Sequence, residues 1–227
     1  MTPRTADRNL PVTPVLRWVR PPQQARSRET LDRILDAAEA LVQEKGFDDT
    51  PVSEIVRRAG SSVGAFYSRF PDKDALLHAL YERYFEQAIA TADDALDPSH
   101  WQRAGTSELV GAVIAFLVEI YREQRGLIRA FVIRNHVDAE FQARRGRLSH
   151  YVSDRLSALL MARGAEICHP DPRRAATFGM TLVFSTLDST MLFGETRSGA
   201  DALSDEELAA ELTRAFLAYL GVPSPSA

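Results

Sequence analysis

Between positions 50 and 73 the sequence gathers small, hydroxylated and aromatic residues within clear helix boundaries. Hydroxyl groups and free N–H groups at the start of a helix suit phosphate oxygens, and valine or alanine side chains suit the methyl group of thymine. Small side chains also let a second molecule approach the backbone closely, and they fill the centre of this stretch, Ser61-Ser62-Val63-Gly64-Ala65. The stretch therefore predicts a surface that contacts DNA.

Two short helices with a tight turn between them are expected here. Thr50 is a good N-cap for the first, with Pro51 at the first helical position, and Gly60 supplies its stop. Ser62 is expected to cap a second helix over 63–70. This arrangement is typical of the helix-turn-helix, whose second helix enters the major groove. An ordinary helical hairpin with small residues for close packing is the alternative.

The second helix has one apolar face and one free face. Phe66 and Phe70 are four residues apart and are expected to face the helical core, whereas the hydroxyl of Tyr67 points elsewhere. Ser68 and Arg69 can reach base edges or phosphates. The candidate DNA-binding residues are Thr50, Ser61, Ser62, Val63, Gly64, Ala65, Tyr67, Ser68, Arg69 and Lys73.

The full pattern extends past the second helix and reads Thr50-x-Val52-x-x-Ile55, then Ala59-Gly60-Ser61-Ser62-x-Gly64-x-Phe66-Tyr67-x-x-Phe70-Pro71-x-Lys73-x-x-Leu76. It resembles the DNA-binding domain of TetR-family transcriptional regulators, over roughly the first third of the chain. Departures from the family's commoner pattern fall at Ser61, Val63, Ser68 and Arg69, which bear on the operator that is read. The resemblance implies a homodimer formed through the last two long helices, and release from DNA when a small, often apolar effector binds.

Charge is distributed unevenly along the 227 residues. The chain has a net charge of −4, yet residues 1–28 hold six arginines against one aspartate, a net +5. A basic arm beside a helix-turn-helix can neutralise phosphates. Its five prolines predict an extended or disordered segment over residues 1–26. A solvated tail whose arginines only aid solubility is the alternative.

The rest of the chain predicts helices and no strand, so the fold class is all-α. Domain boundaries are expected at 27–72 for the DNA-binding domain, 73–95 for a connecting helix, and 96–227 for an effector-binding and dimerisation domain. His78 on the connecting helix is expected to be a packing or surface residue. Further helices are expected from Thr106 to a stop at Gly126, then over 138–163, 173–193 and from 204 onward, with a short apolar segment over 127–133.

The helix over 173–193 is apolar nearly all round, so it is expected to be buried on more than one side. Together with the last helix it has more apolar surface than one protomer covers. Pairing across a two-fold axis would make a four-helix bundle; packing of both helices inside one protomer is the alternative.

An effector pocket is expected among the helices that follow residue 106, because a largely apolar cavity with a few polar groups suits a small molecule. Each aromatic taken singly can equally be plain core, and the hydroxyls can bond a carbonyl one turn earlier. The candidate residues are Phe116, Tyr121, Phe131, His136, Phe141, Tyr151, Phe178, Thr181, Ser185 and Asp188.

No sequence motif indicates an enzyme. The five histidines lack metal spacing, and no Gly-rich phosphate loop or nucleophile elbow occurs. No cofactor is expected. The single cysteine, Cys168, suits a reducing compartment, no apolar run approaches the ~20 residues that span a bilayer, and the N-terminus has no apolar signal segment. The sequence predicts a cytoplasmic transcriptional regulator, with more reason for a repressor than an activator. A constitutive DNA binder, or a protein-interaction module of the same fold, is the alternative.

Overall fold

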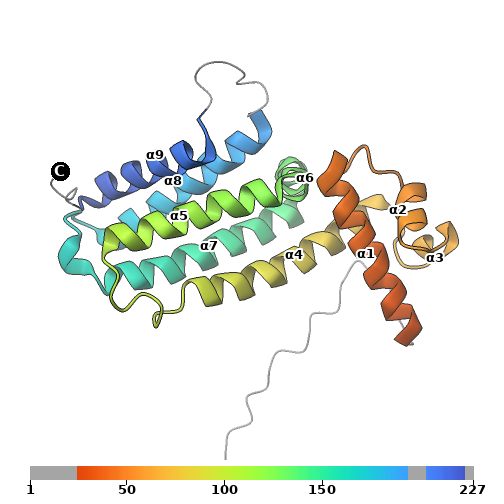
Figure 1. Ribbon diagram of the computed structural model, residues 1–227, viewed down its shortest axis with the longest axis horizontal. Helices are drawn as coiled ribbons and strands as arrows, with labels where there is room; N and C mark the ends of the chain where they lie inside the picture. The colour runs from red at the N-terminus through yellow and green to blue at the C-terminus, as the bar shows by residue number, and fades with distance from the viewer. Residues whose placement is uncertain (1–24, 194–202, 223–227) are drawn as a thin grey trace, which may run out of the picture. The chain divides into compact units, whose positions relative to one another are not determined.

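The computed structural model describes residues 25–193 and 203–222, and every element of regular structure in these ranges is a helix (Figure 1). The all-α prediction is therefore confirmed. The basic arm predicted for residues 1–26 lies almost entirely outside the described residues. The α-helices are α1 Ala25–Lys45, α2 Val52–Arg58, α3 Val63–Tyr67, α4 Lys73–Ala95, α5 Thr106–Glu123, α6 Arg125–Asn135, α7 Ala139–Met161, α8 Pro172–Phe193 and α9 Asp205–Leu220, with a 3₁₀ turn η1 at Gly164–Glu166.

The chain forms two compact units. The described part of Met1–Ala38 belongs to the first unit together with Pro51–Glu82. Glu39–Thr50 and the described part of Arg83–Ala227 belong to the second. Both α1 and α4 therefore contribute residues to each unit.

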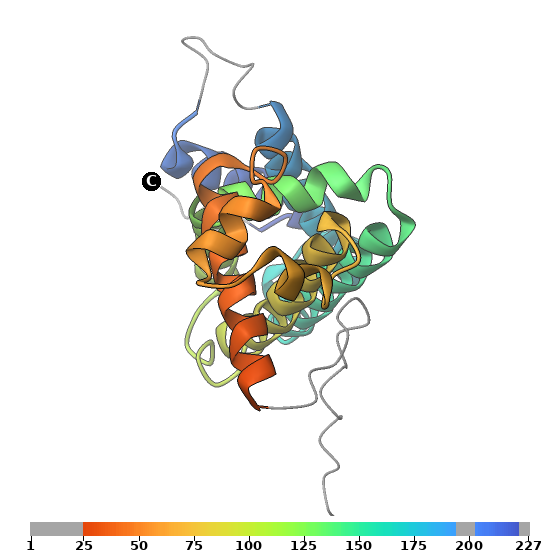
Figure 2. The same ribbon diagram turned by 90° about the vertical axis from the view of Figure 1, so that its right-hand side faces the viewer.

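The first unit contains the short helices α2 and α3, drawn in orange in Figure 2, and side chains cap the starts of α3 and α4. The side chain of Ser62 accepts a hydrogen bond from the N–H of Ala65 at 3.1 Å and caps α3. Asp72 likewise accepts from the N–H of Ala75 at 2.7 Å at the start of α4. Gly60 takes φ +58 in the turn between α2 and α3, a left-handed conformation that favours glycine.

Two details of this unit differ from the sequence prediction. The N-cap of α2 is Pro51 and no side chain caps it, because the hydroxyl of Thr50 donates instead to the carbonyl of Gly46 at 2.7 Å. The second helix ends at Tyr67, three residues before the predicted end. Phe70 nevertheless lies in the core and is completely buried, as predicted.

The second unit is a bundle in which α5, α7, α8 and α9 run beside one another, while α6 is seen end-on in Figure 1 and so crosses them steeply. Aliphatic side chains from α5, α7, α8 and α9 form its core, including Ile114, Leu156, Val183 and Leu212. The start of α5 is held by Glu166, whose carboxylate accepts from the N–H of Thr106 at 2.8 Å. Thr106, from which this helix was expected to run, is its first residue and is completely buried.

The expected stop at Gly126 was wrong. Helix α5 ends at Glu123, and Gly126 lies inside α6, which contains the whole apolar segment predicted over 127–133. A glycine is needed there for a close approach: an added Cβ would lie 2.4 Å from the carbonyl oxygen of Val42 in α1. Glycine here therefore marks a helix contact rather than a helix end.

Helices α8 and α9 pack closely through a second glycine. A Cβ at Gly179 would lie 2.0 Å from the ring of Phe216. The ring therefore packs directly against the backbone of α8. A capping box opens α9, with Ser204 and Glu207 bonding each other's backbone N–H, and Gly221 ends the helix at φ +69.

Candidate DNA interface and effector pocket

The short helix α3 has a buried face and a free face, as its sequence indicates. Phe66 is completely buried, with its ring centroid 5.1 Å from that of Phe70. Val63 and Tyr67 on the other side are 47% and 49% exposed. These two large side chains, with the exposed Gly64 between them, form the surface that α3 offers to a partner.

Several of the predicted DNA-contacting side chains are already engaged. The hydroxyl of Ser68 donates to the carbonyl of Ala65 at 2.9 Å, and the guanidinium of Arg69 donates to the same carbonyl at 2.7 Å. Both side chains therefore stabilise the end of α3. Thr50 is completely buried and its hydroxyl is bonded to Gly46, so the structure removes Thr50 from the candidate interface.

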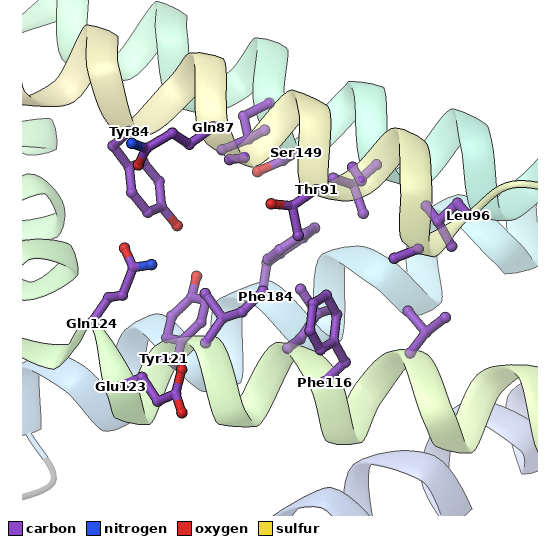
Figure 3. A pocket seen from close by; sticks show the side chains of 18 of the residues that line it. Tyr84, Gln87, Thr91, Leu96, Phe116, Tyr121, Glu123, Gln124, Ser149 and Phe184 are labelled. Atoms are coloured by element: carbon purple, nitrogen blue, oxygen red, sulfur yellow. The ribbon is translucent and has the colours of Figure 1, made fainter.

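The second unit holds a cavity of about 260 Å³ between α4, α5, α7 and α8 (Figure 3). Tyr84 and Tyr121 point their hydroxyls into the same space, close to Gln124, whereas Phe116 and Leu96 line the opposite end. The residues that line it are Tyr84, Gln87, Ala88, Thr91, Ala92, Ala95, Leu96, Val113, Phe116, Leu117, Ile120, Tyr121, Glu123, Gln124, Arg145, Leu148, Ser149, Val152 and Phe184.

Three side chains form a hydrogen-bonded cluster at the polar end of this pocket. The guanidinium of Arg145 donates to Asp188 at 2.5 Å and to the hydroxyl of Tyr121 at 3.0 Å. Tyr121 in turn donates to the other oxygen of Asp188 at 2.9 Å. The side chains of Arg145 and Asp188 are only 19% and 22% exposed. The cluster therefore brings one positive and one negative charge together in a mostly buried place.

Burial controls the protonation of this cluster and of Tyr84, which shares the pocket with it. It raises the pKa of Tyr84 to about 12 and raises the pKa of Tyr121 as well, although the charge of Arg145 acts in the opposite direction on both. Burial also raises the pKa of Asp188 above its usual range, against the lowering effects of Arg145 and Tyr121. Both tyrosines consequently remain neutral hydrogen-bonding groups at neutral pH.

Of the predicted effector residues, Phe116 and Tyr121 line the pocket, and Asp188 bonds Tyr121. The others lie elsewhere for identifiable reasons. Phe131 and Phe141 are buried core rings in contact with each other, and His136 is bonded to the carbonyl of Val132. Tyr151 donates to Asp93 outside the pocket. The exposed face of α8 holds Phe178, Thr181 and Ser185.

The α4 residues of the pocket were not predicted from the sequence, and on α7 the predicted residues were Phe141 and Tyr151 rather than Arg145 and Ser149. Tyr84, Gln87 and Thr91 are three and four residues apart, so they lie along one side of α4. Arg145 and Ser149 are likewise four apart on α7. Polar residues repeating at helical spacing beside small apolar residues were the available signal.

Two further features bear on the class of site. Within the described ranges, no helix is both long and apolar enough to cross a membrane. No group of three or more histidine, cysteine, aspartate or glutamate side chains suited to a metal ion occurs among residues 25–193 and 203–222.

A helix-turn-helix with an exposed second helix, followed by a helical unit with its own cavity, defines a DNA-binding transcriptional regulator. Residues 34–80 match the family "Bacterial regulatory proteins, tetR family", and residues 107–220 match "Tetracyclin repressor-like, C-terminal domain". The chain belongs to the TetR family of transcriptional regulators.

Curated relatives agree with this assignment. The chain is 43% identical over 58 residues to the uncharacterized HTH-type transcriptional regulator YvdT of Bacillus subtilis, an alignment that covers 26% of this chain and 30% of YvdT. It is 26% identical over 197 residues to the uncharacterized HTH-type transcriptional regulator Rv2250c of Mycobacterium tuberculosis, covering 85% and 95% of the two chains. The chain thus spans less than a third of the length of YvdT, but nearly all of Rv2250c.

Solved structures share the fold at low identity. A TetR-family regulator from Mesorhizobium loti aligns with a TM-score of 0.64 and 20% identity, covering 86% of this chain and 98% of that one. Bacillus subtilis FadR, solved in complex with stearoyl-CoA, aligns with a TM-score of 0.58 and 18% identity, covering 84% and 97%.

Proposed function

We propose that this chain is a homodimeric repressor that binds a palindromic operator through α3 and leaves it when a small molecule occupies the pocket. The observation that carries the proposal is the combination, in one chain, of an exposed recognition helix and a separate cavity of about 260 Å³. Helix α4 joins the two features, since it begins in the first unit and contributes Tyr84, Gln87 and Thr91 to the pocket.

Exposure separates base-reading residues from supporting ones on α3. Val63 is large, apolar and half exposed, which suits contact with a thymine methyl, and Ala65 can do the same. Tyr67 and Lys73 suit phosphate oxygens, together with Ser61, Ser62 and the backbone at Gly64. Ser68 and Arg69 would have to leave the carbonyl of Ala65 to reach DNA.

The exposed apolar surface of α8 supports a dimer. Phe178, Leu182 and Phe193 are 45%, 42% and 54% exposed in the single chain. A second copy of the same chain would cover these side chains and complete a four-helix bundle with α8 and α9 of each protomer. Two recognition helices related by a two-fold axis require a palindromic operator. Sedimentation of the purified chain should then give twice its mass of 25.2 kDa.

An effector is supported by the pocket, and by analogy with FadR of Bacillus subtilis, whose related fold holds stearoyl-CoA. The coupling would pass through elements that contribute to both units. Besides α4, helix α1 also contributes to both units, and its end is bonded to α5 and α6 within the second: Gln43 donates to the carbonyl of Glu123 and accepts from the N–H of Leu127, both at 3.1 Å. A coupling free energy of about 1–3 kcal/mol would change DNA affinity roughly 5–150-fold.

A ligand-independent DNA binder, or a protein-interaction module, is the competing function. Either would be favoured by a filled core in the second unit. The cavity and its polar end argue for the ligand-responsive reading instead.

Val63 offers a direct test of base reading. Val63→Ala should lower affinity for the preferred operator about 5–100-fold, because a good base contact contributes about 1–3 kcal/mol of discrimination, and it should relax preference at one position in each half-site. Replacing the thymine at that position by uracil removes only the methyl group and should weaken the wild-type protein while leaving Val63→Ala almost unaffected. Fluorescence anisotropy with labelled duplexes measures both effects.

Tyr67→Phe is the matched control because it removes a hydroxyl from the same exposed face. It should weaken binding to all sequences similarly, as expected for a phosphate contact, and Lys73→Ala should behave in the same way. An unchanged sequence preference for Val63→Ala would refute its base-reading role.

A further inference from the structure

The charges around the pocket restrict the chemistry of its ligand. Arg145 and Glu123 are the charged side chains among the pocket-lining residues that the structure describes. Arg145 is already paired with Asp188 at 2.5 Å. The Glu123 side chain is 62% exposed and lies 3.8 Å from Arg122. The pocket therefore offers no uncompensated charge to a ligand.

An anionic ligand would have to compete with Asp188 for the guanidinium of Arg145. Success would leave the Asp188 carboxylate, only 22% exposed, without its cationic partner, and burying such a charge unpaired is strongly unfavourable. A cationic ligand faces the same problem with Arg145 in place of Asp188. Both signs of charge are consequently penalised by the same ion pair.

Neutral hydrogen-bonding groups also line the pocket. The side chains of Gln87, Thr91, Gln124 and Ser149 make no hydrogen bond to another described residue. Two of them are primary amides, which donate and accept without carrying charge. Figure 3 shows the amide of Gln124 near the hydroxyls of Tyr84 and Tyr121, and Phe116 and Leu96 toward the other end.

We infer that the pocket binds an uncharged amphipathic molecule, with a hydroxyl, carbonyl or amide head against Tyr84, Gln124 and Tyr121 and an apolar body toward Phe116 and Leu96. This inference rests on the proposed effector site and specifies the class of its ligand. Discrimination against charged analogues comes from the Arg145–Asp188 pair, since the pair keeps the site neutral while holding Tyr121 in place.

Three eight-carbon probes with similar shapes test the inference: octanamide, octanoate and octylammonium. Isothermal titration calorimetry of the purified full-length chain at pH 7 should give a dissociation constant for octanamide at least tenfold lower than for either ion. Tighter binding of octanoate or octylammonium to the wild-type protein would overturn the inference, as would failure of all three to bind at millimolar concentration.

Asp188→Asn should reverse the discrimination. It keeps an oxygen that can accept from Tyr121 but leaves the charge of Arg145 unbalanced, so octanoate should bind at least tenfold more tightly while octanamide changes less than threefold. Arg145→Gln should favour octylammonium instead, and it decides the question if Asp188→Asn does not fold. Asp154→Asn, which changes an exposed carboxylate of α7, is the control and should leave all three affinities unchanged. An unchanged order of affinities in folded Asp188→Asn or Arg145→Gln would contradict the inference.

Because the titrations contain no DNA, they separate this inference from the proposed function. If octanamide binds as expected yet leaves operator binding unchanged, the ligand class stands and release from DNA by such a ligand fails. If operator binding responds to a charged compound seated in the pocket, the proposed function stands and the ligand class fails.

Discussion

Gly126→Ala is expected to lower the free energy of unfolding by about 1–3 kcal/mol, the usual cost of overpacking a tight contact. The new Cβ would lie 2.4 Å from the carbonyl oxygen of Val42 and 2.7 Å from the Cα of Gln43. Both are backbone atoms, so no side-chain rotation relieves the clash. Helix α6 must therefore move away from the end of α1, and urea denaturation would measure the loss.

Gly146→Ala provides the matched control. Gly146 lies inside α7, and an added Cβ there meets no atom within 4 Å. Alanine is the better helix former by about 0.8–1 kcal/mol, so this substitution should stabilise the protein by up to that amount. Opposite signs for two glycine-to-alanine changes would establish that the contact with α1, rather than helix propensity, determines the result at Gly126. Equal stabilisation by the two substitutions would contradict a steric role for Gly126.

The same contact bears on communication between ligand and DNA. Gln43 satisfies the carbonyl of Glu123, at the end of α5, and the N–H of Leu127, in the first turn of α6. Displacing α6 by Gly126→Ala separates these partners. The variant should therefore keep its pocket ligand affinity within a few-fold while losing part of the ligand's effect on operator binding.

Arg145→Met is expected to have the second large effect, a loss of about 1–3 kcal/mol at pH 7. Removing one partner of a buried ion pair usually costs about 3–5 kcal/mol, and the partial exposure of both side chains reduces that figure. The loss arises mainly because Asp188 keeps its charge in a mostly buried place without a partner. Denaturation of the wild type and the variant in parallel measures it.

The stability deficit of Arg145→Met should shrink as the pH falls. Burial raises the folded-state pKa of Asp188 above its unfolded value. The native state then binds more protons, so this group contributes stability at low pH that is lost as pH rises through the folded pKa. Removing Arg145 raises the pKa of Asp188 further, so the stability lost on ionisation of Asp188 is lost at a higher pH. The asparagine in Asp188→Asn does not titrate, so the stability of that variant should lack the pH dependence that Asp188 contributes. A stability deficit of Arg145→Met that does not change with pH would contradict the role given to Asp188.

Local signals made the DNA-binding unit readable from the sequence. Ser62 and Asp72 cap their helices through hydrogen bonds within three residues, and Phe66 and Phe70 fall four apart on the buried face. The prediction of Thr50 as the N-cap of α2 was wrong because its hydroxyl donates to the carbonyl of Gly46, earlier in the chain, rather than accepting from an N–H of α2. A threonine before a helix permits both bonds, and only the surrounding packing selects one.

The pocket was harder to predict because a helix that is apolar all round does not reveal which side faces its own protomer. On α8, Phe184 lines the cavity and Asp188 bonds the lining residues Tyr121 and Arg145, while Phe178, Thr181 and Ser185 lie on exposed surface. Gly126 was read as a helix stop because its steric role depends on Val42, eighty-four positions earlier. Contacts between distant segments, rather than local propensity, determine both features.

Selection of bound sequences from a random duplex DNA pool, using the purified full-length chain, tests the central claim most directly. The account predicts an enriched palindrome whose half-sites hold a thymine at the position read by Val63. It also predicts loss of enrichment when a mixture of uncharged amphipathic small molecules is present, and a smaller loss when Gly126→Ala replaces the wild-type chain in that mixture. No enrichment at low salt, or an enriched site without two-fold symmetry, would contradict a dimeric regulator that reads DNA through α3.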